Sequence, residues 1–141
     1  MASGGEARRP IVAIIDDEVD ITTYLRLALE DNGYQVVVIN EAGRALERVR
    51  DTLPDVILLD LLMPEMTGAS LYGRIASDPL LGRTPVVILS GLEAREDLPG
   101  LLARQGGGRP PRAFIDKPVD IEEVLSIIGS ILATGAKGDA A

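Results

Sequence analysis

The chain alternates short apolar runs with longer stretches in which apolar residues recur every three or four positions. Each run is too short for a typical helix and has the length of a strand buried on both faces of a sheet. The predicted strands are 11–15, 35–39, 56–59, 84–90 and 113–116. The helical spacing predicts helices over about 20–32, 42–49, 68–76 and 121–132, and a shortened helix that ends near 105. It places Tyr24 in the core, and Asp120 is a candidate N-cap of the last helix.

The order of these elements predicts an α/β fold. Strands that alternate with helices form a parallel sheet covered on both faces, and right-handed crossovers bring the carboxyl ends of the strands to one edge. At 141 residues the chain is long enough for one domain with a substantial core. We expect that domain at 10–132, with unstructured tails at 1–9 and 133–141.

The stretch between the fourth and fifth predicted strands is irregular. Pro99 would disrupt the interior of a helix, so we expect Asp97 to cap a short helix that has Pro99 in its first turn. Three glycines and two prolines within 105–112 are typical of a loop. We therefore predict a mobile segment within 91–97 or 105–112.

Composition excludes several classes of function. The net charge of −8 argues against direct binding to a nucleic-acid backbone. The chain contains no cysteine and no histidine, which excludes thiolate chemistry, imidazole-ligated metal and catalysis by a histidine base. No apolar run approaches the roughly 20 residues that span a bilayer, and the N-terminus lacks the apolar core of a signal peptide. We expect a cytoplasmic protein without a membrane partner.

Polar side chains follow the predicted strands at the edge where their carboxyl ends meet. Asp16 and Asp17 follow the first strand, Asp60 ends the third, Ser90 ends the fourth and Lys117 follows the fifth. Glu18, the next acid after Asp17, is expected to be solvated. Like charges about 4 Å apart cost about 4 kcal/mol per pair at an effective dielectric of 20, so either one acid is protonated or a cation lies among them. Oxygen ligands without histidine or cysteine favour Mg²⁺ or Mn²⁺. A carboxylate beside such an ion, an ammonium and a hydroxyl can attack phosphorus.

These residues, in this order on alternating elements, resemble the receiver domain of bacterial two-component response regulators. The resemblance rests on Asp16 and Asp17, on Asp60 with Met63, Pro64 and Gly68, on Ser90, and on Lys117 with Pro118. It covers nearly the whole folded chain and is closest to single-domain regulators of the chemotaxis and sporulation type. It implies a flavodoxin-like (βα)5 three-layer sandwich whose five parallel strands have the order 2-1-3-4-5. It also implies a phosphoacceptor that catalyses only its own phosphorylation and dephosphorylation.

The resemblance implies a role for each of these residues. Asp60 would accept the phosphoryl group, and Asp17, Asp60 and the backbone carbonyl of Leu62 would hold Mg²⁺, with Asp16 acting directly or through a water. Ser90 and Lys117 would bind the phosphoryl oxygens, and the Lys117–Pro118 peptide bond would be cis. Phe114 occupies the position of the switch aromatic, where many relatives have tyrosine.

The absence of histidine means that the phosphoryl group must come from outside the chain. The implied partners are a histidine kinase or a histidine phosphotransfer protein, and a downstream protein target that the sequence does not identify. The face made by the fourth helix and fifth strand is where relatives dimerise or bind targets, so a homodimer is possible. Leu62 and Leu92 flank the site and cannot orient an attacking water, so we predict slow self-dephosphorylation.

There are four other interpretations of the sequence. The chain could be a receiver excised from a hybrid kinase or a larger regulator. It could be a Mg²⁺-dependent phosphatase that works through an aspartyl phosphate, although such enzymes need a second acid where this chain has Leu62. A flavin-binding flavodoxin is disfavoured because no phosphate-binding loop rich in glycine and hydroxyl side chains follows Ile15. A degenerate receiver that acts only as a scaffold is disfavoured by the complete set of acids.

Overall fold

A sheet of five parallel strands forms the centre of the computed structural model, which describes residues 8–61, 68–91 and 98–134. The strands are β2 (Ile11–Ile15), β3 (Gln35–Ile39), β4 (Val56–Asp60), β5 (Val86–Ser90) and β6 (Ala113–Asp116). Their order across the sheet is β3-β2-β4-β5-β6, and each neighbouring pair is parallel. Counted along the chain this is 2-1-3-4-5, which confirms the predicted topology.

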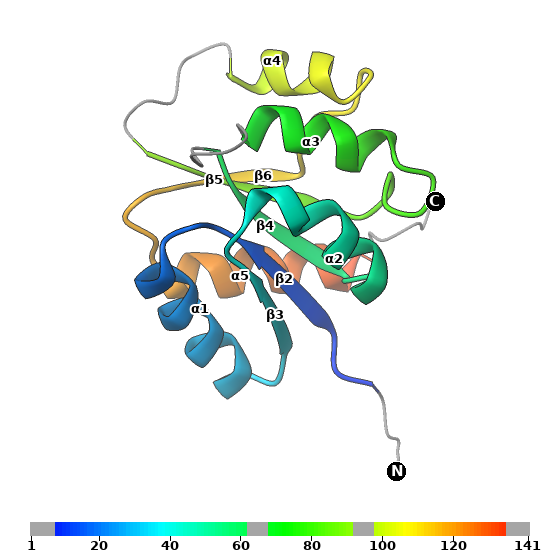
Figure 1. The fold of residues 1–141 in the computed structure, drawn as a ribbon. Helices are drawn as coiled ribbons and strands as arrows, with labels where there is room; N and C mark the ends of the chain where they lie inside the picture. Colours follow the sequence, from blue (N-terminus) through cyan, green and yellow to red (C-terminus); the bar gives the residue numbers. More distant parts are fainter. Residues whose placement is uncertain (1–7, 62–67, 92–97, 135–141) are drawn as a thin grey trace.

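Helices cover both faces of this sheet (Figure 1). They are α1 (Val19–Asp31), the 3-10 turn η1 (Ala42–Arg44), α2 (Ala45–Thr52), α3 (Gly68–Ser77), α4 (Leu98–Gln105) and α5 (Ile121–Ala133). The buried residues of α2, α3 and α4 belong to one hydrophobic cluster, and those of α1 and α5 to another. The predicted three-layer sandwich is therefore confirmed.

The central strand β4 is buried along its whole length, which explains its continuous apolar run. Ile57 and Leu59 pack into the cluster on the α2–α3–α4 face, whereas Val56 and Leu58 pack into the cluster on the α1–α5 face. Burying a side chain of this size contributes about 1.5–3 kcal/mol, so β4 is strongly held on both sides. The strand ends on Asp60, which is only 3% exposed. The core thus fixes the position of that carboxylate.

Two predicted helix boundaries agree with the structure, and one predicted core residue is wrong. The Asp120 carboxylate caps α5 by accepting a hydrogen bond from the N–H of Glu122, at 3.0 Å. α4 ends at Gln105 and has Pro99 in its first turn, as predicted, while Asp97 lies outside the described residues. Tyr24 was expected in the core but is 47% exposed, because α1 buries a narrow stripe made by Thr22, Leu25 and Leu29.

The segment 105–112 follows α4 with a tight glycine turn. Gly107 and Gly108 adopt positive φ angles of 68° and 98°, a conformation that glycine adopts at little cost. Gly106 and Pro111 are buried despite the loop-like composition of the segment. The mobility predicted for this segment stays a prediction, and residues 92–97 lie outside the described part of the chain.

Candidate functional site

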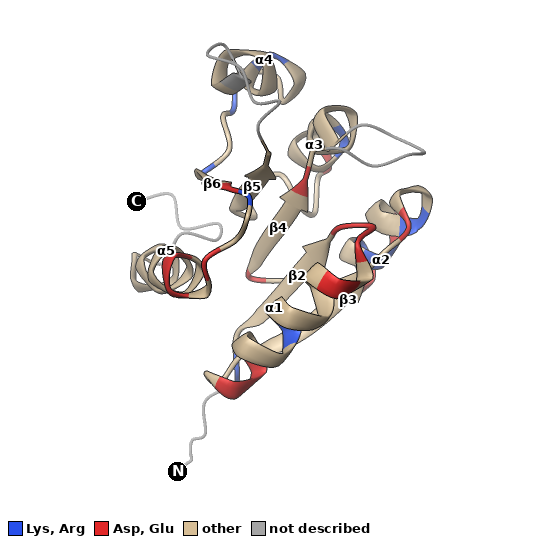
Figure 2. Ribbon diagram, turned by 90° about the vertical axis from the view of Figure 1, so that its left-hand side faces the viewer, with Lys and Arg blue, Asp and Glu red and all other residues tan. Residues whose placement is uncertain are grey.

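The carboxyl ends of the strands bring the predicted acids together. β2 and β4 are neighbours with Ile15 opposite Leu59, so Asp16 and Asp60, the next residues along, lie side by side. The tip of β4 is coloured as acidic in Figure 2. One carboxylate oxygen from each of Asp16, Asp17 and Asp60 lies within 4.8 Å of the others. The convergence predicted from the sequence is therefore present.

These three acids are a costly arrangement without a cation. Asp16 is completely buried, Asp60 is 3% exposed and Asp17 is half-buried. At about 5 Å and an effective dielectric of 20, each pair of ionised carboxylates repels by about 3 kcal/mol. The fold nonetheless keeps them together through the packing of β2 and β4. An arrangement held against its own repulsion is typical of a functional site.

Lys117 supplies positive charge to this cluster. Its Nζ lies 3.0 Å from Asp60 Oδ1, 3.2 Å from Asp16 Oδ2 and 3.1 Å from Glu18 Oε1. Burial alone would lower the pKa of Lys117, but the hydrogen bond with Asp60 and the charge of Asp16 raise it well above its usual value. Lys117 is therefore a permanent cation at neutral pH.

The backbone around Lys117 positions its side chain. The Lys117 N–H donates to the carbonyl of Ser90 at 2.7 Å, which holds the residue against the end of β5. The Lys117–Pro118 peptide bond is cis, as the resemblance implied.

Asp16 has one oxygen that the protein satisfies and one that it does not. Oδ1 accepts a hydrogen bond from the Glu18 N–H at 3.0 Å. Oδ2 is completely buried and accepts no hydrogen bond within the described residues, although it lies near Lys117 Nζ. Burial raises the pKa of Asp16 above 3.8, and the Glu18 N–H and Lys117 offset part of that rise. A divalent cation would give Oδ2 a second positive neighbour beside Lys117 and would relieve the repulsion between the acids, so the residues present fit Mg²⁺.

Two residues at the site were missed or misjudged from the sequence. Glu18 was expected to be simply solvated, but although its side chain is 57% exposed it also pairs with Lys117. Asn40 follows β3, and its Nδ2 donates to the backbone carbonyl of Asp16 at 2.8 Å and to Thr22 Oγ1 at 3.2 Å. Its position directly after a strand was the one signal that could have identified it, because that is where the acids also lie.

The two predicted switch residues lie on the neighbouring strands. Ser90 is the last residue of β5 and is 1% exposed. Phe114 is in β6 opposite Ile88, half-buried, and packs against the cluster on the α2–α3–α4 face. Leu62 and Leu92 lie outside the described residues.

Known proteins share this arrangement of elements. The family model described as the response regulator receiver domain matches residues 12–129 of the chain. The chain belongs to this family. The receiver domain is 30% identical over 127 residues to protein Rrf1 of Nitratidesulfovibrio vulgaris, covering 90% of this chain and 86% of Rrf1. It is 29% identical over 122 residues to protein PilH of Pseudomonas aeruginosa, covering 86% of this chain and 97% of PilH.

Solved structures have the same fold. The chemotaxis protein CheY4 of Vibrio cholerae aligns with a TM-score of 0.78 at 23% identity, covering 88% of the receiver domain and 99% of CheY4. Receiver domains are phosphoacceptors of two-component signalling that interact with histidine kinases or phosphotransfer proteins and with downstream targets. They generally bind Mg²⁺ in an acidic pocket. This membership favours the receiver interpretation over the phosphatase and the flavodoxin. None of the described helices is both long and apolar enough to cross a bilayer.

Proposed function

We propose that this receiver domain, at 10–132, takes a phosphoryl group onto the Asp60 carboxylate from a phosphohistidine of a histidine kinase or phosphotransfer protein. The observation that carries the proposal is the placement of Lys117 Nζ at 3.0 Å from Asp60 Oδ1, within a cluster of buried acids. Among the described acids, Asp60 is the one that is itself the last residue of a buried strand and has an ammonium and two further acids beside it.

The proposed transfer is a direct displacement at phosphorus. An Asp60 carboxylate oxygen forms a bond to phosphorus while the bond from phosphorus to the imidazole nitrogen breaks, and the leaving nitrogen keeps the electron pair and takes a proton. Lys117 remains protonated and stabilises the negative charge that collects on the phosphoryl oxygens. The buried floor made by β4 holds the nucleophile in a fixed position.

Asp16, Asp17 and Asp60 are the residues of the described chain that would hold Mg²⁺. When bound, the ion supplies positive charge that draws the phosphoryl oxygens toward the nucleophile and neutralises their charge. Asp16 is suited to this role because its buried Oδ2 accepts no hydrogen bond in the described structure. The backbone carbonyl of Leu62, the fourth proposed ligand, lies outside the described residues.

Phosphorylation would switch the domain through Ser90 and Phe114. A phosphoryl group adds a charge of about −1.5 to −2 and three acceptor oxygens next to the end of β5. We expect the Ser90 hydroxyl to move toward these oxygens and Phe114 to move further into the core behind it. Phe114 is already half-buried against the core, so this step needs a side-chain movement and no refolding of β6. The changed surface would then bind a downstream protein.

Chemical phosphorylation followed by intact mass measurement tests the proposal. The protein is incubated with phosphoramidate and Mg²⁺, and we expect the gain of one phosphoryl group that hydroxylamine removes, as it does from an acyl phosphate. Asp60→Asn should gain none. Asp116→Asn is the matched control, because Asp116 is an exposed acid at the end of β6 beside Lys117 and should not affect the reaction. Phosphorylation of Asp60→Asn at the wild-type rate would refute the assignment.

A further inference from the structure

The segment 106–112, here called the strap, lies against α3. The Tyr72 hydroxyl of α3 donates a hydrogen bond to the carbonyl of Arg109 at 2.7 Å. Gly106 is buried at the base of the strap, where a Cβ would lie only 2.8 Å from the Arg109 carbonyl oxygen and 2.9 Å from the Tyr72 ring. The strap is therefore fitted closely to α3 at this point, although its composition predicted a loop.

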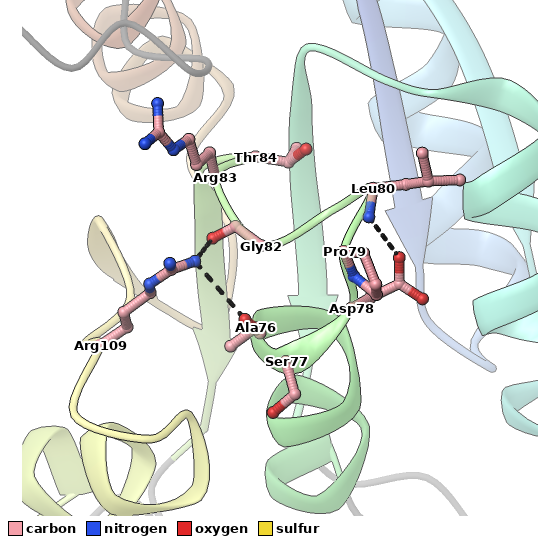
Figure 3. Close-up of a pocket in the computed structure, with 9 residues that line it drawn as sticks. All are labelled: Ala76, Ser77, Asp78, Pro79, Leu80, Gly82, Arg83, Thr84 and Arg109. Carbon is pink, nitrogen blue, oxygen red and sulfur yellow. Dashed lines mark hydrogen bonds between the residues drawn. The ribbon is translucent and has the colours of Figure 1, made fainter.

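Arg109 also closes the C-terminal end of α3. Its guanidinium donates hydrogen bonds to the backbone carbonyls of Gly82 and, at 3.5 Å, of Ala76 (Figure 3). The last carbonyls of a helix lack partners within the helix and carry partial negative charge, so a cation is favourable there. Arg109 forms one wall of a pocket of about 460 Å³ between α3 and β5. The residue is exposed, so its release into water would leave no buried charge behind.

At its other end, α3 contacts the strand that carries the phosphoacceptor. The Gly68 N–H donates to the carbonyl of Leu61 at 2.7 Å, and a Cβ on Gly68 would overlap the backbone of Asp60 and Leu61. In the middle of α3, a Cβ on Gly73 would lie 2.7 Å from the Gln105 carbonyl oxygen at the end of α4. α3 is thus in close contact with the backbone of Asp60 and with that of Gln105, the residue directly before the strap. A movement at the end of β4 must be absorbed by α3 or passed along it.

The strap is built so that it can leave α3. Its first part is a glycine turn in which a Cβ on Gly107 or Gly108 would meet nothing within 4 Å, and glycine has access to more backbone conformations than any other residue. Its second part contains Pro110 and Pro111, whose rings fix the φ angles and make this part of the backbone stiff. Between these parts, Arg109 anchors the strap by two exposed guanidinium hydrogen bonds and by the part-buried hydrogen bond from the Tyr72 hydroxyl.

We propose that the strap is a latch that, docked on α3, favours the unphosphorylated arrangement of α3 and α4, and that phosphorylation of Asp60 releases it. This inference rests on the proposed function, because it takes Asp60 as the phosphoacceptor. The coupling between the two sites is reciprocal by thermodynamic linkage. If the phosphoryl group weakens docking of the strap, then loss of the docking contacts must strengthen binding of a phosphoryl mimic at Asp60 by the same factor.

The test measures binding of beryllofluoride, a phosphoryl mimic, in the presence of Mg²⁺ by isothermal titration calorimetry on the full chain. Arg109→Ala removes the guanidinium contacts, and Tyr72→Phe removes only the hydroxyl that bonds the strap. Arg112→Ala is the matched control: it removes the same charge from the same segment, and its exposed side chain makes no hydrogen bond or ion pair in the described structure. We expect about fivefold or tighter binding in the first two variants, at the lower end of typical couplings, and no change in the control.

The outcomes separate the two proposals. Wild-type protein that binds no beryllofluoride overturns both the latch and the proposed function. Wild-type binding with unchanged or weaker binding in both Arg109→Ala and Tyr72→Phe overturns the latch alone. If thermal melts show that Arg109→Ala is unfolded, Tyr72→Phe decides the matter. As an independent measurement, hydrogen exchange of residues 106–112 in the wild type should become faster when beryllofluoride and Mg²⁺ are added, and unchanged exchange would also overturn the latch.

Discussion

The close approach of α3 and α4 makes a prediction with an internal control, because the same substitution should stabilise one helix and not the other. Gly73 lies in the interior of α3 and Gly129 in the interior of α5. Alanine in place of glycine in a helix interior stabilises it by about 1 kcal/mol. A Cβ on Gly129 meets nothing within 4 Å. Gly129→Ala should therefore raise the free energy of unfolding by close to this full amount.

At Gly73 the same methyl group meets the backbone of α4. Its Cβ would lie 2.7 Å from the Gln105 carbonyl oxygen, whereas ordinary contacts begin near 3.4 Å. One of the two helices must move, and overpacking of this kind costs about 1–3 kcal/mol. Set against the gain of about 1 kcal/mol from helix propensity, Gly73→Ala should be neutral to about 2 kcal/mol less stable than wild type. The two variants should therefore differ by about 1–3 kcal/mol.

Urea denaturation at 25 °C, followed by circular dichroism, measures both variants. Their m-values should equal that of wild type, so that a shifted midpoint reports a change in stability. The melting temperature should rise by several degrees in Gly129→Ala and should stay unchanged or fall in Gly73→Ala. If Gly73→Ala stabilises the protein as much as Gly129→Ala does, then α3 and α4 do not approach as closely as described. The latch would lose its structural basis in the same experiment.

Three further predictions concern the site and the charges around it. Mg²⁺ at about 100 times its dissociation constant should stabilise wild type by about 2.7 kcal/mol, seen as a higher melting temperature that Asp16→Ala no longer shows; an unchanged wild-type melt would contradict the metal assignment. Lys117→Met should slow phosphorylation by phosphoramidate by about 10²-fold in a mass-spectrometric time course, and a wild-type rate would remove Lys117 from the mechanism. Burial raises the pKa of Asp78, but hydrogen bonds from the Leu80 N–H and Arg50 outweigh it and hold the pKa below 3.8. A carboxylate whose pKa is lower in the folded state stabilises the protein above its unfolded-state pKa, and this stabilisation is lost as the pH falls through its folded-state pKa. Asp78→Asn should therefore be less stable than wild type at neutral pH, and the difference in melting temperature should disappear below pH 3.8. A difference that does not change with pH would refute this.

The apolar runs predicted the sheet because a strand that is buried on both faces is apolar at nearly every position, and such a run is visible in the sequence. β4 is the clearest case, since all five of its residues are buried and its last one is Asp60. The meeting of Asp16 and Asp60 followed from the geometry of parallel strands, which brings their carboxyl ends to one edge. The order of the strands did not follow from the pattern. It came from the resemblance to receiver domains, because the sequence of an apolar strand does not indicate which strands pair with it.

The features that the sequence did not predict depend on contacts between distant segments. Helical spacing placed Tyr24 on the apolar side of α1, but only the sheet decides how wide the buried stripe is, and Tyr24 lies outside it. Arg109 caps α3 through backbone carbonyls, and such partners have no signature in the sequence. Glu18 looked like any charge at a helix start until the fold brought Lys117 to it from the far end of the chain.

The two hydrophobic clusters lie on opposite faces of the sheet, so the domain presents two separate helical surfaces. The sheet lies between them as a partition, with α1 and α5 on one side and α2, α3 and α4 on the other. Asp60 is the last residue of β4 and therefore lies at the edge of the sheet that separates the two clusters. Under the proposed function, a donor that approached over α1 would leave the α3–α4 side uncovered, and a target protein could already be bound there when the phosphoryl group is transferred. Phosphoryl transfer from the donor and binding of the downstream protein would then need no exchange of partners.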